Sequence, residues 1–124
     1  MPWAIEMGDA LRSWCNAGTE DEMPAKVNTE YFQAALEGYA PSMKSNLTQP
    51  EIQALVDTMW LVCSELSIRF FADALNEDYF GFDKKKYKTA GDANLARGKA
   101  MSSLADDVQA QKSTLSDIVN KTFG

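Results

Sequence analysis

Arg69 is the residue whose surroundings most strongly indicate binding chemistry. It stands between Ile68 and Phe70 in an apolar run, and a guanidinium buried by such a run must find hydrogen-bond acceptors. The acceptors are either a carboxylate one helical turn away, on Asp73 or Glu65, or a bound ligand. The sequence leaves both alternatives open.

Histidine and several motifs that catalytic sites use are missing from the sequence. There is no histidine, so neither a Ser-His-Asp triad nor a His-x-Asp catalytic loop can form. The glycines are isolated, which excludes a glycine-rich phosphate loop. No set of carboxylates suited to holding magnesium beside a nucleotide is recognisable. We therefore expect no catalytic residue, no metal site and no cofactor within these 124 residues.

The two cysteines, Cys15 and Cys63, belong to no Cys-x-x-Cys motif. Without histidine they cannot complete a zinc site, so we expect both to be reduced, buried and apolar in character. No apolar run reaches the ~20 residues that a membrane-spanning helix needs, and the first residues do not form a signal peptide. The sequence therefore predicts a cytoplasmic protein that does not bind membranes.

The charge of the chain argues against a nucleic-acid partner. The net charge is −6, whereas nucleic-acid affinity rests largely on Lys and Arg neutralising phosphates. Lys84, Lys85, Lys86 and Lys88 form one basic cluster. Asp83 and other acidic residues lie close by, so the cluster is expected to be a solvated turn.

The composition and the hydrophobic spacing predict an all-α fold, a helical bundle of four main helices in one domain that spans residues 1–124. The chain is 45% hydrophobic and 10% aromatic, with long helix-forming runs. A chain of this size can bury a real core. The expected helices run from Asp9 to about Asn16, from Asn28 or Thr29 to the region of Gly38 and Pro41, from about Gln49 to Leu75, and from about Asp92 to Lys121.

Local signals place the ends of these helices. Asp9 is expected to cap the first helix with its carboxylate, and Gly18 to end that helix. Thr48 and Glu51 have the spacing of a capping box, which would open the third helix. That third helix is apolar on most of its circumference, so its neighbours are expected to wrap it.

Three separated segments carry a family resemblance. They are Gly8-Asp9-Ala10-Leu11-Arg12 with the acidic Glu20-Asp21-Glu22, then Ile68-Arg69-Phe70-Phe71-Ala72-Asp73-Ala74-Leu75 with Asp78-Tyr79-Phe80, and finally Asn94-Leu95-Ala96-Arg97. Together they resemble the C-terminal helical part of the aminoglycoside phosphotransferase superfamily, and within it the N-acetylhexosamine 1-kinases.

The resemblance implies a kinase-like phosphotransferase subdomain. In that family the metal-binding Asp precedes the position of Met1, so the ATP-binding lobe and the catalytic loop would lie outside this chain. Arg69 and Tyr79 would help to bind the sugar or its phosphate. Asp9 and Arg12 would support the catalytic loop from behind without touching the ligand.

Two functions follow as alternatives. The first is a catalytically incomplete phosphotransferase-like domain that binds a polar, sugar-like small molecule or a protein, and that is an enzyme only if an ATP-binding lobe is supplied by another chain. The second is a helical interaction protein that self-associates as a homo-oligomer without a ligand. Its contact surface would be the apolar residues Pro2, Trp3, Ile5 and Trp14.

Overall fold

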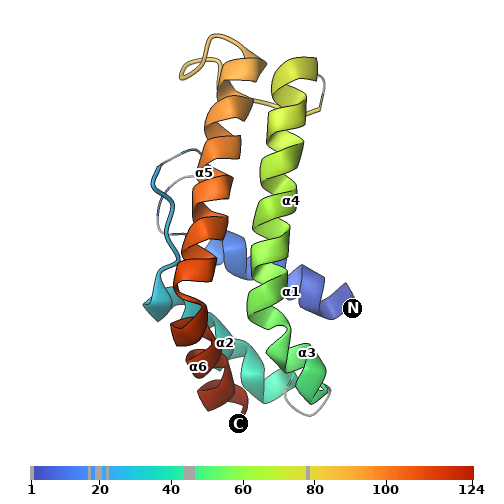
Figure 1. The fold of residues 1–124 in the computed structure, drawn as a ribbon, viewed down its shortest axis with the longest axis vertical. Coiled ribbons are helices and arrows are strands. Elements are labelled where there is room, and N and C mark those ends of the chain that lie inside the picture. The colour runs from blue at the N-terminus through green and yellow to red at the C-terminus, as the bar shows by residue number, and fades with distance from the viewer. Residues whose placement is uncertain (1, 17, 19–20, 22, 44–46, 78) are drawn as a thin grey trace.

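The computed structural model describes residues 2–16, 18, 21, 23–43, 47–77 and 79–124 (Figure 1). Every regular element in these residues is a helix, which confirms the predicted all-α class. The helices are α1 (Pro2–Trp14), α2 (Thr29–Met43), α3 (Gln49–Gln53), α4 (Leu55–Asn76), α5 (Ala90–Ala110) and α6 (Lys112–Phe123). None of them combines the length and the apolar composition needed to cross a membrane.

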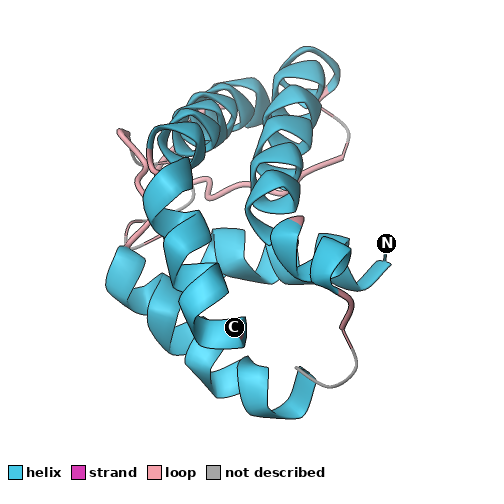
Figure 2. Cartoon of the chain, turned by 60° about the horizontal axis from the view of Figure 1, so that its bottom comes forward, coloured by secondary structure: helices cyan, strands magenta, loops and turns pink. Residues whose placement is uncertain are grey.

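Two long helices form the frame of the molecule. α4 and α5 lie side by side and antiparallel, and the four shorter helices gather around the lower half of this pair (Figure 1). α1 crosses α4, and α2 packs against α6 (Figure 2). The arrangement is therefore one pair of long helices with four shorter helices packed around one end, and not a bundle of four long helices.

Two of the four predicted long helices are each broken in two. The predicted helix from Gln49 to Leu75 is interrupted at Ala54, which separates α3 from α4. The last predicted helix is interrupted at Gln111, whose side-chain amide donates to the Val27 carbonyl at 3.1 Å and to Asp107 Oδ2 at 2.6 Å. α6 then turns against α2.

The predicted start of the first helix is wrong. α1 begins at Pro2, because a proline suits the first helical turn, where its missing N–H costs nothing. Asp9 lies in the middle of this helix and does not cap it, and α1 ends at Trp14, before Gly18. The predicted end of α2 is also wrong, because this helix continues through Pro41 to Met43.

The capping box predicted at the start of the third helix is confirmed. The Thr48 hydroxyl oxygen accepts a hydrogen bond from the Glu51 amide, and the Glu51 carboxylate accepts one from the Thr48 amide at 3.1 Å. The backbone amides of Thr48 and Glu51, which have no partner within the helix, are thus satisfied by the motif.

The hydrophobic core lies where the helices meet around α4. Its fully buried large side chains include Leu11, Phe32, Leu36, Leu55, Met59, Phe70, Met101, Leu104 and Leu115. Cys15 and Cys63 are free thiols in the same core, as predicted. The neighbours of α4 do not wrap it completely, however, because Leu61, Ile68 and Leu75 are exposed.

Candidate functional site

The structure brings Arg69 and Tyr79 together at the end of α4. The Arg69 guanidinium carbon lies 5.2 Å from the centre of the Tyr79 ring and 5.7 Å from that of Phe80, within the range of a cation–π contact. The three side chains line a shallow pocket of about 250 Å³ together with Ala72, Asp73 and Asn76. The two residues that the resemblance assigns to one ligand therefore face one pocket.

Asp73 holds the loop that carries Tyr79. Its two carboxylate oxygens accept hydrogen bonds from the backbone amides of Tyr79 and Phe80, each at 3.0 Å. Asn94 Nδ2 donates to the same carboxylate at 2.9 Å. Both Asp73 and Asn94 are buried, and a buried carboxylate needs such partners to remain charged. The position of Tyr79 thus depends on Asp73.

Arg97 ties the start of α5 to the same loop. Its guanidinium donates to the Gly81 carbonyl at 2.7 Å and to Asn94 Oδ1 at 2.9 Å. It also lies over the ring of Phe70, 4.9 Å from the ring centre. The second and third resembling segments, separated in the sequence by residues 81–93, therefore form one network.

The predicted burial of Arg69 is wrong. Arg69 is exposed, and its neighbour Ile68 is 68% exposed, because no helix among the described residues covers them. In the part of the chain that the structure describes, no ion pair joins Arg69 to Glu65 or Asp73. A carboxylate partner was one of the two alternatives that the sequence left open, and the rings of Tyr79 and Phe80 lie against the guanidinium instead.

Asp9 and Arg12 form an ion pair on α1. Arg12 Nη2 and Nε lie 2.8 and 3.0 Å from Asp9 Oδ1. The Arg12 side chain is mostly buried and also contacts the sulfur of Met101 on α5. This pair lies on α1, whereas the Arg69 pocket is formed by the last turns of α4 and the loop that follows it. Arg12 thus connects α1 to α5, Asp9 holds Arg12 in place, and neither residue lines the Arg69 pocket.

One lysine of the basic cluster forms an ion pair. Lys86 Nζ lies 2.7 Å from Asp21 Oδ2, and the Tyr87 hydroxyl donates a hydrogen bond to the same carboxylate. This hydrogen bond raises the pKa of Tyr87 above its usual value. Lys84, Lys85 and Lys88 are exposed, in line with the predicted solvated turn. Sequence reasoning missed the link from this turn to Asp21, which no local pattern signals.

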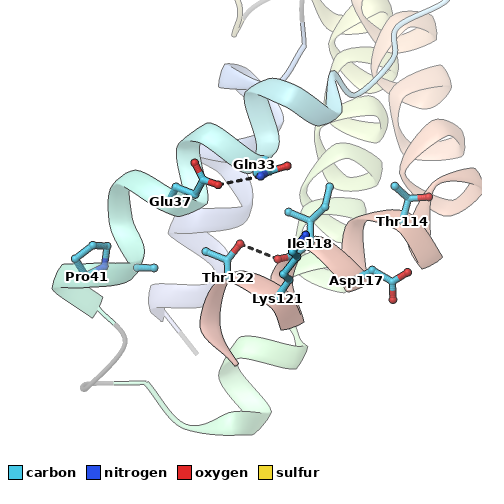
Figure 3. Close-up of a pocket in the computed structure, with 9 residues that line it drawn as sticks. Gln33, Glu37, Pro41, Thr114, Asp117, Ile118, Lys121 and Thr122 are labelled. Carbon is cyan, nitrogen blue, oxygen red and sulfur yellow. Dashed lines mark hydrogen bonds between the residues drawn. The ribbon is translucent and has the colours of Figure 1, made fainter.

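A larger groove between α2 and α6 was also missed. It encloses about 690 Å³, and Figure 3 shows its walls, formed by Gln33, Glu37, Ala40 and Pro41 on one side and by Thr114, Asp117, Ile118, Lys121 and Thr122 on the other. Glu37 accepts from Gln33 within α2, and Thr122 donates to Ile118 within α6. The groove exists only because α6 turns at Gln111, so the sequence pattern alone could not indicate it.

Some predicted features fall on residues outside the structural description. These are the side chains of Pro2, Trp3 and Ile5, and the acidic residues Glu20, Glu22 and Asp78. Of the predicted self-association surface, only Trp14 is described. It is 47% exposed, and its ring stacks on that of Tyr39 at 5.6 Å between centres.

The chemistry that the Arg69 pocket offers is binding. Arg69 supplies guanidinium donors, Tyr79 a ring face and a hydroxyl, and Asn76 an amide. No group of three or more His, Cys, Asp and Glu side chains is placed to hold a metal ion in the described ranges. No known family model matches this chain.

Proposed function

We propose that this chain is the helical, substrate-side part of a kinase-like phosphotransferase, and that Arg69 and Tyr79 form its binding site for a polar, sugar-like small molecule. One observation carries the proposal: the Arg69 guanidinium and the Tyr79 ring lie 5.2 Å apart on the wall of one pocket. The resemblance of residues 68–80 to the sugar-binding segment of these kinases assigns the same two side chains to one ligand.

The chemistry of the pocket fits a hydroxyl-rich or phosphorylated ligand. A guanidinium donates several hydrogen bonds in a fixed plane, which suits vicinal hydroxyls and phosphate oxygens. The ring of Tyr79 is 69% exposed and offers an apolar face for the C–H side of a sugar. Asp73 uses its oxygens on the backbone amides of the loop, so it acts as a positioning residue.

In this proposal the domain is catalytically incomplete. The sequence contains no histidine and no glycine-rich loop, so phosphate transfer would require an ATP-handling lobe that these residues do not include. A cytoplasmic location belongs to the same proposal, because Cys15 and Cys63 are both free thiols and thiols stay reduced in that compartment.

A ligand screen by thermal shift tests the proposal. Hexosamines, aminoglycosides and nucleotides are each added to the chain, and a hexosamine is expected to raise the Tm. The rise should vanish in Arg69→Ala and persist in Lys99→Ala, a control that removes an exposed charge from α5. A sugar-induced rise that survives Arg69→Ala would contradict the site, and turnover of a sugar with magnesium-ATP would contradict the catalytic incompleteness.

A further inference from the structure

The outer side of α4 carries an exposed aliphatic stripe. Leu61, Ile68 and Leu75 are 49%, 68% and 88% exposed. They are spaced seven residues apart, which is close to two helical turns, so they share one side of the helix. α5 lies along another side of α4, and α1 crosses only its lower half (Figure 1).

This stripe has the same pattern when it is read in either direction. Ser64 and Ala72, both small, stand four residues before and four residues after Ile68, and the two leucines stand seven residues before and after it. If a second α4 is laid antiparallel with Ile68 at the centre, Leu61 faces Leu75 and Ser64 faces Ala72. Small residues opposite each other allow two helices to approach closely, and the aliphatic residues then pack between them.

The charges beside the stripe are complementary in the same arrangement. Glu65 and Arg69 lie on one flank of the stripe, three residues before and one residue after Ile68. Antiparallel pairing places Glu65 of each copy near Arg69 of the other, twice by symmetry. Glu65 is exposed, and among the described residues no ion pair includes it.

We infer that α4 is the contact surface between two copies of this chain, paired antiparallel about a two-fold axis at Ile68. α4 has 22 residues and is about 33 Å long at 1.5 Å per residue, so the paired stripe runs along most of the helix. Phe71 and Leu95, 36% and 42% exposed, extend the apolar area on the α5 side. This surface differs from the one predicted around Trp14, and it includes Arg69 and Ala72, which also line the proposed ligand pocket.

Sedimentation of the 124-residue chain tests the inference. A species of twice the 13.7 kDa chain mass is expected, and Ile68→Glu should return it to the single-chain mass. Tyr31→Glu is the matched control, because Tyr31 is 51% exposed on α2 and should leave the dimer intact. Circular dichroism verifies that each variant is folded. A monomer at all concentrations up to millimolar, as expected if a different molecule covers α4, would overturn the inference, as would a dimer that survives Ile68→Glu.

Cysteine cross-linking tests the orientation separately. Ile68→Cys should form a disulfide between copies, because it lies on the axis. Leu61→Cys should link to Leu75→Cys when the two variants are mixed but not to itself, since the two copies of Leu61 would be about 21 Å apart along the helix axis. The native thiols are fully buried and do not compete. Self-linking of Leu61→Cys would indicate parallel pairing and overturn the arrangement.

Discussion

Asp73 and Asn94 join α4 to α5 through a side-chain hydrogen bond of 2.9 Å. The two residues are 4% and 0% exposed. The Asp73 carboxylate also accepts hydrogen bonds from the backbone amides of Tyr79 and Phe80. One buried acidic residue thus fixes both the helix pair and the loop of the candidate site.

Replacing Asp73 should be costly. Asp73→Ala leaves the buried amide of Asn94 and two backbone amides without their acceptor, so the free energy of unfolding should fall by about 3 kcal/mol. Urea denaturation measures the change. Asp106→Ala removes an exposed carboxylate from α5 and should change stability by less than about 0.5 kcal/mol. Equal effects of the two variants would contradict the structural role of Asp73.

Two glycines inside helices should respond to alanine with opposite signs. A Cβ on Gly8 would lie 3.0 Å from the backbone carbonyl carbon of Thr58, whereas a Cβ on Gly38 would have no neighbour within 4 Å. Gly38→Ala should stabilise the protein by about 0.5–1 kcal/mol through helix propensity. Gly8→Ala should destabilise it by about 1–2 kcal/mol, because α1 and α4 must move apart. Thermal unfolding of both variants measures the two effects. Stabilisation by Gly8→Ala would contradict the close packing of α1 on α4.

The residue that ends α4 is strained. Glu77 has a φ of 55° in the left-handed region, where a side chain costs about 1–2 kcal/mol. Glu77→Gly should therefore raise the free energy of unfolding by about 0.5–1 kcal/mol after the entropy of glycine is deducted. Asn76→Gly, one residue earlier and still helical, should lower it by about 0.3 kcal/mol. Chemical denaturation of the two variants measures these changes. Destabilisation by both substitutions would contradict the strain at Glu77.

The buried thiols should be unreactive in the folded protein. Burial raises the pKa of Cys15 and of Cys63 from 9.0 to about 12. A thiol-specific reagent should modify neither residue near neutral pH until denaturant is added. Between pH 9 and pH 12 the unfolded chain loses these protons and the folded chain keeps them, so the free energy of unfolding should fall as the pH rises. The fall should be smaller in Cys63→Ala than in the unchanged protein. An equal fall in the two proteins would contradict the raised pKa of Cys63.

Features set by neighbouring residues could be predicted from the sequence, whereas features set by packing could not. The capping box of Thr48 and Glu51 depends on residues three apart, and the structure confirms it. Asp9 looked equally favourable as a cap, but Pro2 starts the helix earlier and Leu11 packs in the core. The break at Gln111 follows from its hydrogen bond to the distant Val27 carbonyl, which periodicity cannot reveal.

The candidate site was predictable only in part. The pairing of Arg69 with Tyr79 was expected from the resemblance and not from spacing. The role of Asp73 has one signal in the sequence, because this acidic residue falls on the buried face of α4 with Phe70 and Cys63. A carboxylate on a buried helix face must find hydrogen-bond donors inside the protein. For Asp73 these donors include the backbone amides of Tyr79 and Phe80.

The most direct test of the central claim is an NMR titration of the chain with an N-acetylhexosamine and its 1-phosphate. The account predicts saturable shifts at Arg69, Tyr79 and Asn76, three residues that line the pocket, and the loss of these shifts in Arg69→Ala. Shifts confined to the groove between α2 and α6, or no shifts at saturating ligand, would contradict it.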